Sequence, residues 1–371
     1  MRDTDPTSRL EPDPSSWLRL SQAPGVGRIT AANLLRAFGS PAAIFNASRD
    51  ALLAHVTPAQ AASLSAPLSA DTAHLIDTTH AWLAQPGNAL ITLLDPAYPP
   101  LLAEIADCPL LLYIRGRREL LHGAALAIVG SRNASVQGQA NALAFAQALS
   151  EAGLTIVSGL ALGIDTAAHD GALRGCGSTV AVIGTGADRI YPARNAALAR
   201  RIAEEGCMVS EYPLGTPPRP EHFPQRNRII SGLAAGVLVI EAAAGSGSLI
   251  TARMANEQGR DVFALPGSIH AALSKGCHQL IRDGAQLVDS VDDILLALSM
   301  APLVRQAAAA PVLPVPASPL LAILGDDPLH IDAILAHGTM TFSALSAELL
   351  ALEMAGIVAR LPGGLLQRVH R

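Results

Sequence analysis

The sequence of 371 residues contains few aromatic side chains and few cysteines. Phe, Trp and Tyr make up 3% of the residues, so Ala, Leu, Ile and Val must fill the protein interior. The cysteines lie far apart and form no C-x-x-C pair, which argues against a disulfide framework or a zinc site and fits a reduced, cytoplasmic setting. No apolar run approaches the roughly 18 residues of a membrane-spanning helix. The first residues also lack the hydrophobic stretch of a secretory signal. We therefore expect a soluble protein with no membrane contact.

Lysine is almost missing, because Lys275 is the only one and the other cations are arginines. Arginine supplies planar, bidentate donors that suit a phosphate. The net charge of −5 gives no overall attraction to nucleic acid, so any such site must be a local patch. Half of the residues are hydrophobic and 15% are charged, which excludes general disorder.

The length predicts two or three domains at roughly 100–200 residues per domain. Short helical segments interrupted by Gly and Pro predict a small helical domain over 1–85. A longer α/β domain follows over 86–300. Residues 301–318 contain four prolines and no acidic residue, which predicts an extended linker. Residues 319–371 predict three helices and then a hairpin at a Pro-Gly-Gly turn.

The longer domain alternates short apolar segments with amphipathic ones. The expected strands are 125–130, 154–158, 179–184, 207–210, 236–240 and 261–265. The expected helices are 135–152, 164–173, 194–205, 225–234 and 247–258. This alternation predicts a parallel sheet with helices on both faces.

Small polar turns follow nearly every expected strand. They include Gly130-Ser131, Ser158-Gly159 and Gly247-Ser248, and several open a helix. Ligands of an open parallel sheet bind beyond the carboxyl ends of the strands. Backbone N–H groups at a helix start suit an anion. The pattern therefore predicts a site for a phosphate or another anion.

Arginines gather around the same turns. Arg132 directly follows the first strand and is either a phosphate ligand, which we favour, or a capping or salt-bridging side chain. Arg194 stands at the N-terminal edge of a helix, and Arg226, Asn227 and Arg228 lie at another helix start. From residue 189 to residue 228 there are seven arginines against four glutamates, a local excess in an acidic chain.

Familiar nucleotide-binding loops are missing. The loop GSRNASVQG lacks the G-x-G-x-x-G spacing, and GTGADR has Arg189 in place of the third glycine. No G-K-[ST] P-loop occurs. We therefore expect neither NAD nor FAD nor any other cofactor.

The catalytic candidates are few. Asp165 and His169 share a helical face and form either an acid–base pair or, as is more common, structural hydrogen bonds near a helix start. Glu241 follows a strand and is either a general base or an acceptor for neighbouring loop amides. No serine lies in a G-x-S-x-G elbow, and His278 has no second metal ligand at a useful spacing. We predict no catalytic residues and no metal site.

Several consecutive motifs resemble one protein family. They are AIVGSRNAS at 127–135, SGLALGIDTAAH at 158–169, VAVIGTGADRIYPARN at 180–195, SEYPLGT at 210–216, FPQRNRIISGLAAGVLVIEAAAGSGSLITA at 223–252, and LPGS with KGCHQLIRDGA at 265–285. Together they resemble the DNA-processing protein A (DprA/Smf) family. The resemblance implies an extended Rossmann-like domain with a parallel or mixed sheet, flanked by a small helical N-terminal domain and a C-terminal winged-helix-like domain.

The resemblance also implies a function without enzymatic activity. Such proteins bind single-stranded DNA taken up in natural transformation, protect it, help to load the RecA recombinase and act as homodimers. Their DNA contacts fall in a basic pocket at the strand ends, where Arg132 and Arg194 match family positions. The predicted DNA-binding residues are Gly130, Ser131, Arg132, Ser158, Gly159, Arg194, Arg226, Asn227, Arg228, Gly247, Ser248 and Lys275.

Other functions remain open from the sequence. The main alternative is a Rossmann-like nucleotide hydrolase similar to the phosphoribohydrolases, although the loop EAAAGSGSLITA lacks their PGGxGTxxE signature. A pure protein-interaction scaffold would bind no DNA. Residues 23–40 resemble a helix-hairpin-helix in which Arg28 and Arg36 could hold a phosphate, but we favour a helical adaptor. The expected third C-terminal helix, 341–353, contains no Arg or Lys, so we predict a protein-contact module rather than a reader of duplex DNA.

Overall fold

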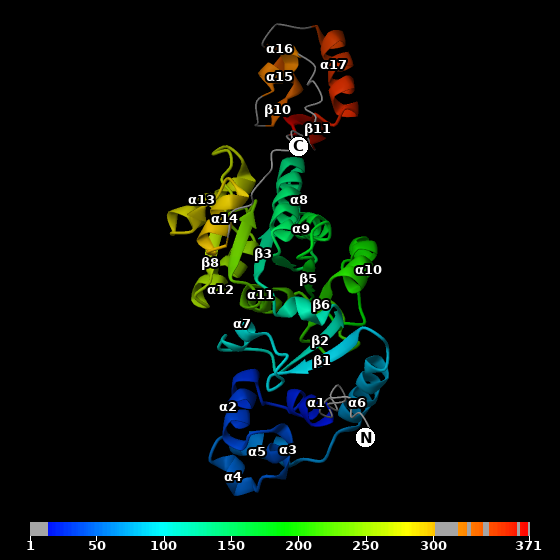
Figure 1. Ribbon diagram of the computed structural model, residues 1–371, viewed down its shortest axis with the longest axis vertical. Helices are drawn as coiled ribbons and strands as arrows, with labels where there is room; N and C mark the ends of the chain where they lie inside the picture. The colour runs from blue at the N-terminus through cyan, green and yellow to red at the C-terminus, as the bar shows by residue number, and fades with distance from the viewer. Residues whose placement is uncertain (1–13, 301–317, 325–327, 337–340, 362–363, 370–371) are drawn as a thin grey trace, which may run out of the picture.

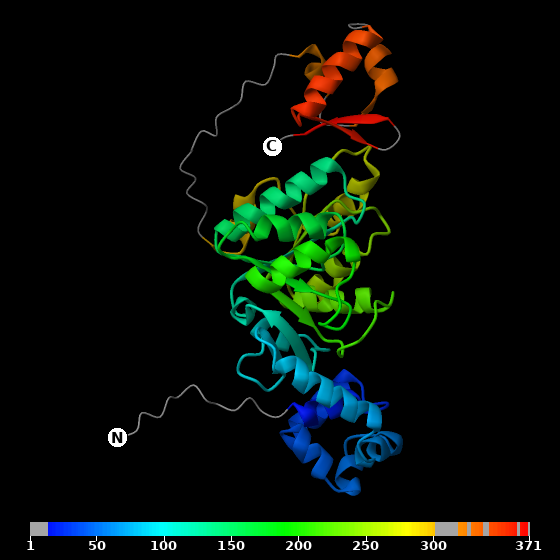
Figure 2. The same cartoon turned by 90° about the vertical axis from the view of Figure 1, so that its right-hand side faces the viewer.

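The computed structural model describes most of the chain in three parts: a helical N-terminal part, a central α/β domain and a small C-terminal domain (Figures 1 and 2). The described residues are 14–300, 318–324, 328–336, 341–361 and 364–369. The linker predicted over 301–318 lies, except for Ser318, outside the described residues, and so do residues 1–13. Within the described residues, no helix has both the length and the apolar character to cross a bilayer.

The N-terminal part is a group of short helices that begin at well-suited residues. They are α1 (Ser15–Ser21), α2 (Arg28–Phe38), α3 (Pro41–Asn46), α4 (Arg49–Leu53), α5 (Pro58–Ser65) and α6 (Ala70–Leu83). The hydroxyls of Ser40, Ser48, Thr57 and Ser69 each accept a hydrogen bond from the backbone N–H three residues later. These caps satisfy amides that a helix start leaves unpaired, which allows such short helices to form.

The helical part packs on the first hairpin of the central sheet, which is formed by β1 (Asn88–Thr92) and β2 (Leu111–Gly116). Trp82 of α6 lies edge-on against Tyr113 of β2, with 5.8 Å between the ring centroids. Leu90 of β1 belongs to the same apolar cluster as the buried side chains of the helices. The helical part therefore has no separate core and shares one with the sheet.

The central sheet has nine strands in the order β1-β2-β6-β5-β4-β3-β7-β8-β9. The further strands are β3 (Ala125–Gly130), β4 (Thr155–Ser158), β5 (Thr179–Val182), β6 (Cys207–Ser210), β7 (Gly236–Ile240), β8 (Asp261–Ala264) and β9 (Gln286–Leu287). Strands β3 to β9 pair in parallel, whereas β2 pairs antiparallel with both β1 and β6. The predicted α/β class with a mixed sheet is confirmed, and β3 to β8 lie where the apolar segments predict strands.

Helices cover both faces of this sheet. They are α8 (Val136–Glu151), α9 (Ile164–Ala172), α10 (Ala196–Glu205), α11 (His222–Gly232), α12 (Ser248–Glu257), α13 (Lys275–Arg282) and α14 (Val291–Ala297). Leu126 and Ile128 of β3 pack with α8 and α9 on one face. Ala127 and Val129 of the same strand pack with α11 and α12 on the other. Successive side chains of a strand alternate between faces, so β3 is buried from both sides.

In its described residues, the C-terminal domain combines three helices with a small antiparallel sheet. Its elements are α15 (Pro319–Ile323), β10 (Leu329–His330), α16 (Ile331–Ala336), α17 (Phe342–Met354), β11 (Val358–Leu361) and β12 (Leu365–Arg368). The strands lie in the order β10-β12-β11. Leu345, Leu349 and Leu352 of α17 are buried in the core of this domain. Helix α17 lies where the third C-terminal helix is predicted.

Candidate functional site

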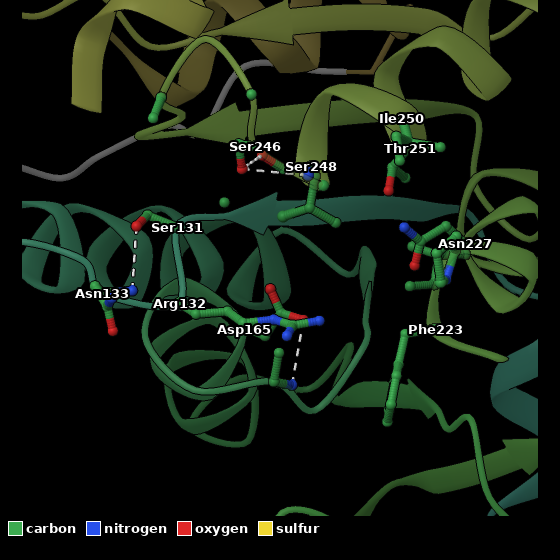
Figure 3. A pocket seen from close by; sticks show the side chains of 18 of the residues that line it. Ser131, Arg132, Asn133, Asp165, Phe223, Asn227, Ser246, Ser248, Ile250 and Thr251 are labelled. Carbon is green, nitrogen blue, oxygen red and sulfur yellow. Dashed lines mark hydrogen bonds between the residues drawn. The ribbon is translucent and has the colours of Figure 1, made fainter. Parts of the chain in front are cut away.

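A pocket of about 700 Å³ opens at the carboxyl ends of the central strands (Figure 3). Its lining includes seven of the predicted residues, namely Gly130, Ser131, Arg132, Arg226, Asn227, Gly247 and Ser248. The structure adds Asp165, Phe223, Ser246 and Thr251 to them. The lining comes from the turn after β3, the start of α9, the first half of α11 and the start of α12. The sheet therefore brings together side chains that are more than 100 residues apart in the sequence.

Arg132 provides an exposed positive charge at this pocket. Its guanidinium carbon lies 5.8 Å from the ring centroid of Phe223, and the corresponding atom of Arg226 lies 5.9 Å from the same ring. The centroid of the Tyr191 ring lies 5.5 Å from that of Phe223. No carboxylate in the described part of the chain forms an ion pair with Arg132. Its charge is thus available to an anionic ligand.

Arg226 is a buried charge behind the pocket surface. It is 4% exposed, and its Nη1 donates a hydrogen bond of 2.9 Å to the carbonyl oxygen of Val182. Burial lowers the pKa of Arg226 to about 10, and the nearby carboxylate of Asp165 opposes that shift. Burial likewise raises the pKa of Asp165, while Arg226 lowers it. Arg226 and Asp165 are thus two buried ionisable groups that interact electrostatically at the floor of the pocket.

Gly159 is needed for Arg226 to occupy this place. A Cβ on Gly159 would lie 1.8 Å from Nη1 of Arg226 and 2.9 Å from Oδ2 of Asp165. The amide of Gly159 donates a hydrogen bond of 3.1 Å to that same Oδ2. Ser158 donates its hydroxyl hydrogen to the carbonyl oxygen of Ile128, 2.7 Å away. Ser158 and Gly159 therefore support the pocket from behind and do not line it.

Asp165 and His169 hold the loop between β4 and α9. Nε2 of His169 accepts a hydrogen bond from the amide of Leu160 at 3.2 Å, and Nδ1 lies 2.7 Å from Oγ1 of Thr179. That hydroxyl donates to a backbone carbonyl, so Nδ1 carries the hydrogen of the neutral ring. Burial lowers the pKa of His169 to about 3. The geometry thus supports structural hydrogen bonds for Asp165 and His169 rather than an acid–base pair.

Asn195 contacts this loop from the 3₁₀ helix Ala193–Asn195, and sequence reasoning missed it although it ends the motif at 180–195. Its side-chain amide donates hydrogen bonds of 2.9 and 3.3 Å to the carbonyl oxygens of Leu160 and Ala161. Leu160 has a φ of +56°, a conformation that costs energy for a residue with a side chain. The hydrogen bonds of His169 and Asn195 hold Leu160 in that conformation.

The loop before α12 and the start of that helix supply hydroxyls to the pocket. The hydroxyls of Ser246 and Ser248 lie 2.7 Å apart, and Figure 3 shows them across the pocket from Arg132. Glu241, which precedes this loop, accepts hydrogen bonds from the amide and the hydroxyl of Ser135. Its carboxylate caps α8, so it acts as an acceptor for loop amides. The hydroxyl of Ser131 accepts a hydrogen bond from a backbone amide, and those of Ser246 and Ser248 bond to each other. Among the described residues, no general base forms a hydrogen bond with these three hydroxyls.

Three predicted residues lie outside the pocket. Arg228 is buried and forms ion pairs with Glu211 and Asp107, at 2.6 and 2.8 Å. Lys275 begins α13 and donates a hydrogen bond to the carbonyl oxygen of Ile269. Arg194 is exposed in the short 3₁₀ helix Ala193–Asn195. The structure thus does not bring these three residues to the pocket lining.

No group of three His, Cys, Asp or Glu side chains among the described residues is arranged to hold a metal ion. The pocket instead offers arginines and hydroxyls. With the Rossmann-like sheet, they define an α/β protein whose site suits an anionic ligand. The family model of DNA recombination-mediator protein A matches residues 89–299, and that of the DprA winged helix domain matches residues 304–364. The chain belongs to the DNA-processing protein A (DprA/Smf) family.

Individual relatives agree with this assignment. Protein Smf of Escherichia coli (strain K12) is 43% identical over 302 residues, covering 78% of this chain and 80% of its own. The structure of DNA processing protein A from Streptococcus pneumoniae is 40% identical with a TM-score of 0.63, covering 76% of this chain and 96% of that chain. DNA processing protein A from Helicobacter pylori, described for its unique single-stranded DNA binding mode, is 29% identical with a TM-score of 0.52. It covers 57% of this chain and 95% of that chain. The family and the winged-helix-like C-terminal domain predicted from the sequence are confirmed.

Proposed function

We propose that the pocket binds single-stranded DNA, and that the protein protects incoming DNA and helps to load RecA recombinase during natural transformation. Membership in the family supports this, and so does the Helicobacter pylori relative with its single-stranded DNA binding mode. The observation that carries the proposal is the exposed guanidinium of Arg132, which lies beside Phe223 at the pocket and has no ion-pair partner among the described carboxylates.

The proposed contacts are mainly to the DNA backbone. Arg132 and the hydroxyls of Ser246 and Ser248 are donors around one pocket. Phosphate oxygens accept such hydrogen bonds and carry no sequence information. Binding by these groups is therefore insensitive to base sequence and weakens as salt rises.

Two aromatic side chains extend the proposed interface toward the bases. Tyr191 is 46% exposed, and its ring lies 5.5 Å from that of Phe223. The exposure of Tyr191 supports a stacking role. Stacking of a base on an aromatic ring contributes about 1–3 kcal/mol. A strand that leaves the pocket over Phe223 would meet Tyr191 next.

Substitution of Arg132 tests the proposal. Arg132→Ala should weaken single-stranded DNA binding and reduce the slope of log K against log salt by about 0.7, the contribution of one phosphate contact. The matched control is Arg174→Ala, because Arg174 is also exposed and its one ion pair within the described residues is with the surface residue Asp170. The readout is fluorescence anisotropy of a labelled oligonucleotide across a salt series. Equal affinity and slope for Arg132→Ala and wild type, with both folded, would reject the pocket as the binding site.

We also propose that the protein catalyses no reaction. The carboxylate of Glu241 caps α8, and the buried His169 is neutral, so each of these possible bases has a structural role. Incubation with AMP and detection of the free base tests this directly. Release of adenine above the level of a protein-free control would favour the phosphoribohydrolase-like alternative.

The remaining family properties are proposals of the same kind. We propose a homodimer in the cytoplasm, with RecA as a protein partner and the chain divided into 1–85, 86–300, a linker over 301–318 and 319–371. Light scattering of the purified protein tests the dimer, and co-purification with RecA in the presence of single-stranded DNA tests the partner.

A further inference from the structure

A buried glutamate joins the N-terminal helices to the helix that forms one wall of the pocket. Glu211 follows β6, and its side chain is 6% exposed. Its Oε1 accepts a hydrogen bond of 2.9 Å from Arg228, and its Oε2 accepts one of 2.6 Å from the same guanidinium. Oε2 also accepts a hydrogen bond of 3.0 Å from Arg28, the first residue of α2. One carboxylate oxygen is thus shared between two parts of the chain that are 200 residues apart.

Arg228 transmits this contact to α11. Its side chain is 4% exposed, and Nε donates a hydrogen bond of 2.8 Å to Oδ2 of Asp107. The guanidinium is therefore held from two sides and fixes the helix that carries it. The same helix brings Phe223 and Asn227 to the pocket. A change in the position of Arg228 would move these lining residues with it.

The neighbouring residue holds the first turn of the same helix. The ring of Tyr212 stacks on His222 with 4.0 Å between centroids and 15° between planes. The Tyr212 hydroxyl donates a hydrogen bond of 3.2 Å to the carbonyl oxygen of His222. Residues 211 and 212 thus contact α11 at its start and at Arg228, on either side of Phe223. The N-terminal helices reach this segment through Arg28.

We propose that Arg28 and Glu211 are positioning residues, through which the N-terminal helices hold α11 in the conformation that binds DNA. The inference rests on the proposed function of the pocket. Arg28 was a candidate phosphate contact of a helix-hairpin-helix, but its guanidinium pairs with a buried carboxylate instead. The N-terminal helices then raise the affinity for single-stranded DNA without touching the strand.

Arg28→Ala in the full chain tests this inference. We expect its affinity for single-stranded DNA to fall about two- to thirtyfold, the range of mutations in a coupled network. The salt slope should stay at the wild-type value, because no phosphate contact is lost. Arg28→Lys should restore the affinity, since Arg28 contacts Glu211 through a single nitrogen, Nη1, which a lysine amine can replace. Arg36→Ala is the matched control, because Arg36 lies on the same helix and, among the described residues, donates a hydrogen bond to Asn33 and not to Glu211.

The affinity and the salt slope of Arg28→Ala distinguish a positioning role from a direct phosphate contact. A salt slope reduced by about 0.7 in Arg28→Ala would show a direct phosphate contact and overturn the inference. Wild-type affinity in a folded Arg28→Ala would show that the contact only joins the two parts, and would also overturn it. Arg132→Ala is measured alongside: if it binds as wild type does, the proposed function of the pocket fails; if it is weakened while Arg28→Ala is not, only the positioning role fails.

Discussion

Arg228→Ala should lower the free energy of unfolding, because Arg228 belongs to a buried cluster of ion pairs. The substitution removes the hydrogen bonds of the guanidinium to both oxygens of Glu211 and to Asp107. Glu211, which is 6% exposed, would keep Arg28 as its remaining ion-pair partner among the described residues. Removing one partner of a buried ion pair costs about 3–5 kcal/mol.

The loss should be visible in thermal unfolding. For a domain of 150–250 residues, 1 kcal/mol shifts Tm by about 2–4 °C. We therefore expect the main transition, followed by circular dichroism, to fall by roughly 6–20 °C. Arg228→Lys keeps a charge but cannot span Glu211 and Asp107 together. Its Tm should therefore lie between that of the wild type and that of Arg228→Ala. Arg132→Ala, at an exposed residue, should melt as wild type does, within about 0.5 kcal/mol. A wild-type Tm for Arg228→Ala would refute the structural role of the buried cluster.

Three further predictions concern the pocket floor, pH and the C-terminal domain. Gly159→Ala should displace Arg226 from Val182, at a cost of about 1–3 kcal/mol for the unpaired buried group; chemical denaturation would show it, with Gly27→Ala as the control because nothing lies within 4 Å of a Cβ there. The pKa of His169 falls from 6.5 to about 3 on folding, so the unfolded chain binds one more proton between these values. Stability should therefore drop by about 1.4 kcal/mol per pH unit as pH falls through that window. His169→Gln should remove this contribution. If the free energy of unfolding of this variant varies with pH as that of the wild type does, the pKa of His169 is not lowered in the folded protein. Truncation after Met300 should leave single-stranded DNA affinity nearly intact, because α17 presents no Arg or Lys; a tenfold loss, about 1.4 kcal/mol, in a folded protein would contradict this.

The sequence predicts the parallel part of the sheet well, because strands buried on both faces appear as continuous apolar segments. Strands β3 to β7 are of this kind, whereas β8 begins at the exposed Asp261 and is buried only in its second half. The hairpin β1–β2 escapes the same reasoning, since proline-rich connections surround its strands. The antiparallel pairing of β2 with β6 joins segments about 100 residues apart, which no local pattern reveals. Strand β9 has only two residues, Gln286–Leu287, and leaves no pattern.

The site was predictable in its location but not in the role of each arginine. Arg226 and Arg228 look alike in the sequence, at one helix start. Two residues along a helix correspond to about 200° around its axis, so the two side chains point in nearly opposite directions. Arg226 lies at the pocket, whereas Arg228 meets Glu211. The acidic partner comes from another strand end, and only the folded chain shows which arginine it neutralises.

Photo-crosslinking tests the central claim most directly. Single-stranded DNA that carries a halogenated pyrimidine is irradiated with the full-length protein, and the crosslinked peptides are identified by mass spectrometry. Aromatic side chains near a base react well, so binding in the pocket predicts crosslinks at Phe223 or Tyr191 that disappear in excess unlabelled strand. Crosslinks confined to the N-terminal helices α1–α6 or to the C-terminal helix α17 would contradict the assignment of the pocket as the DNA-binding site.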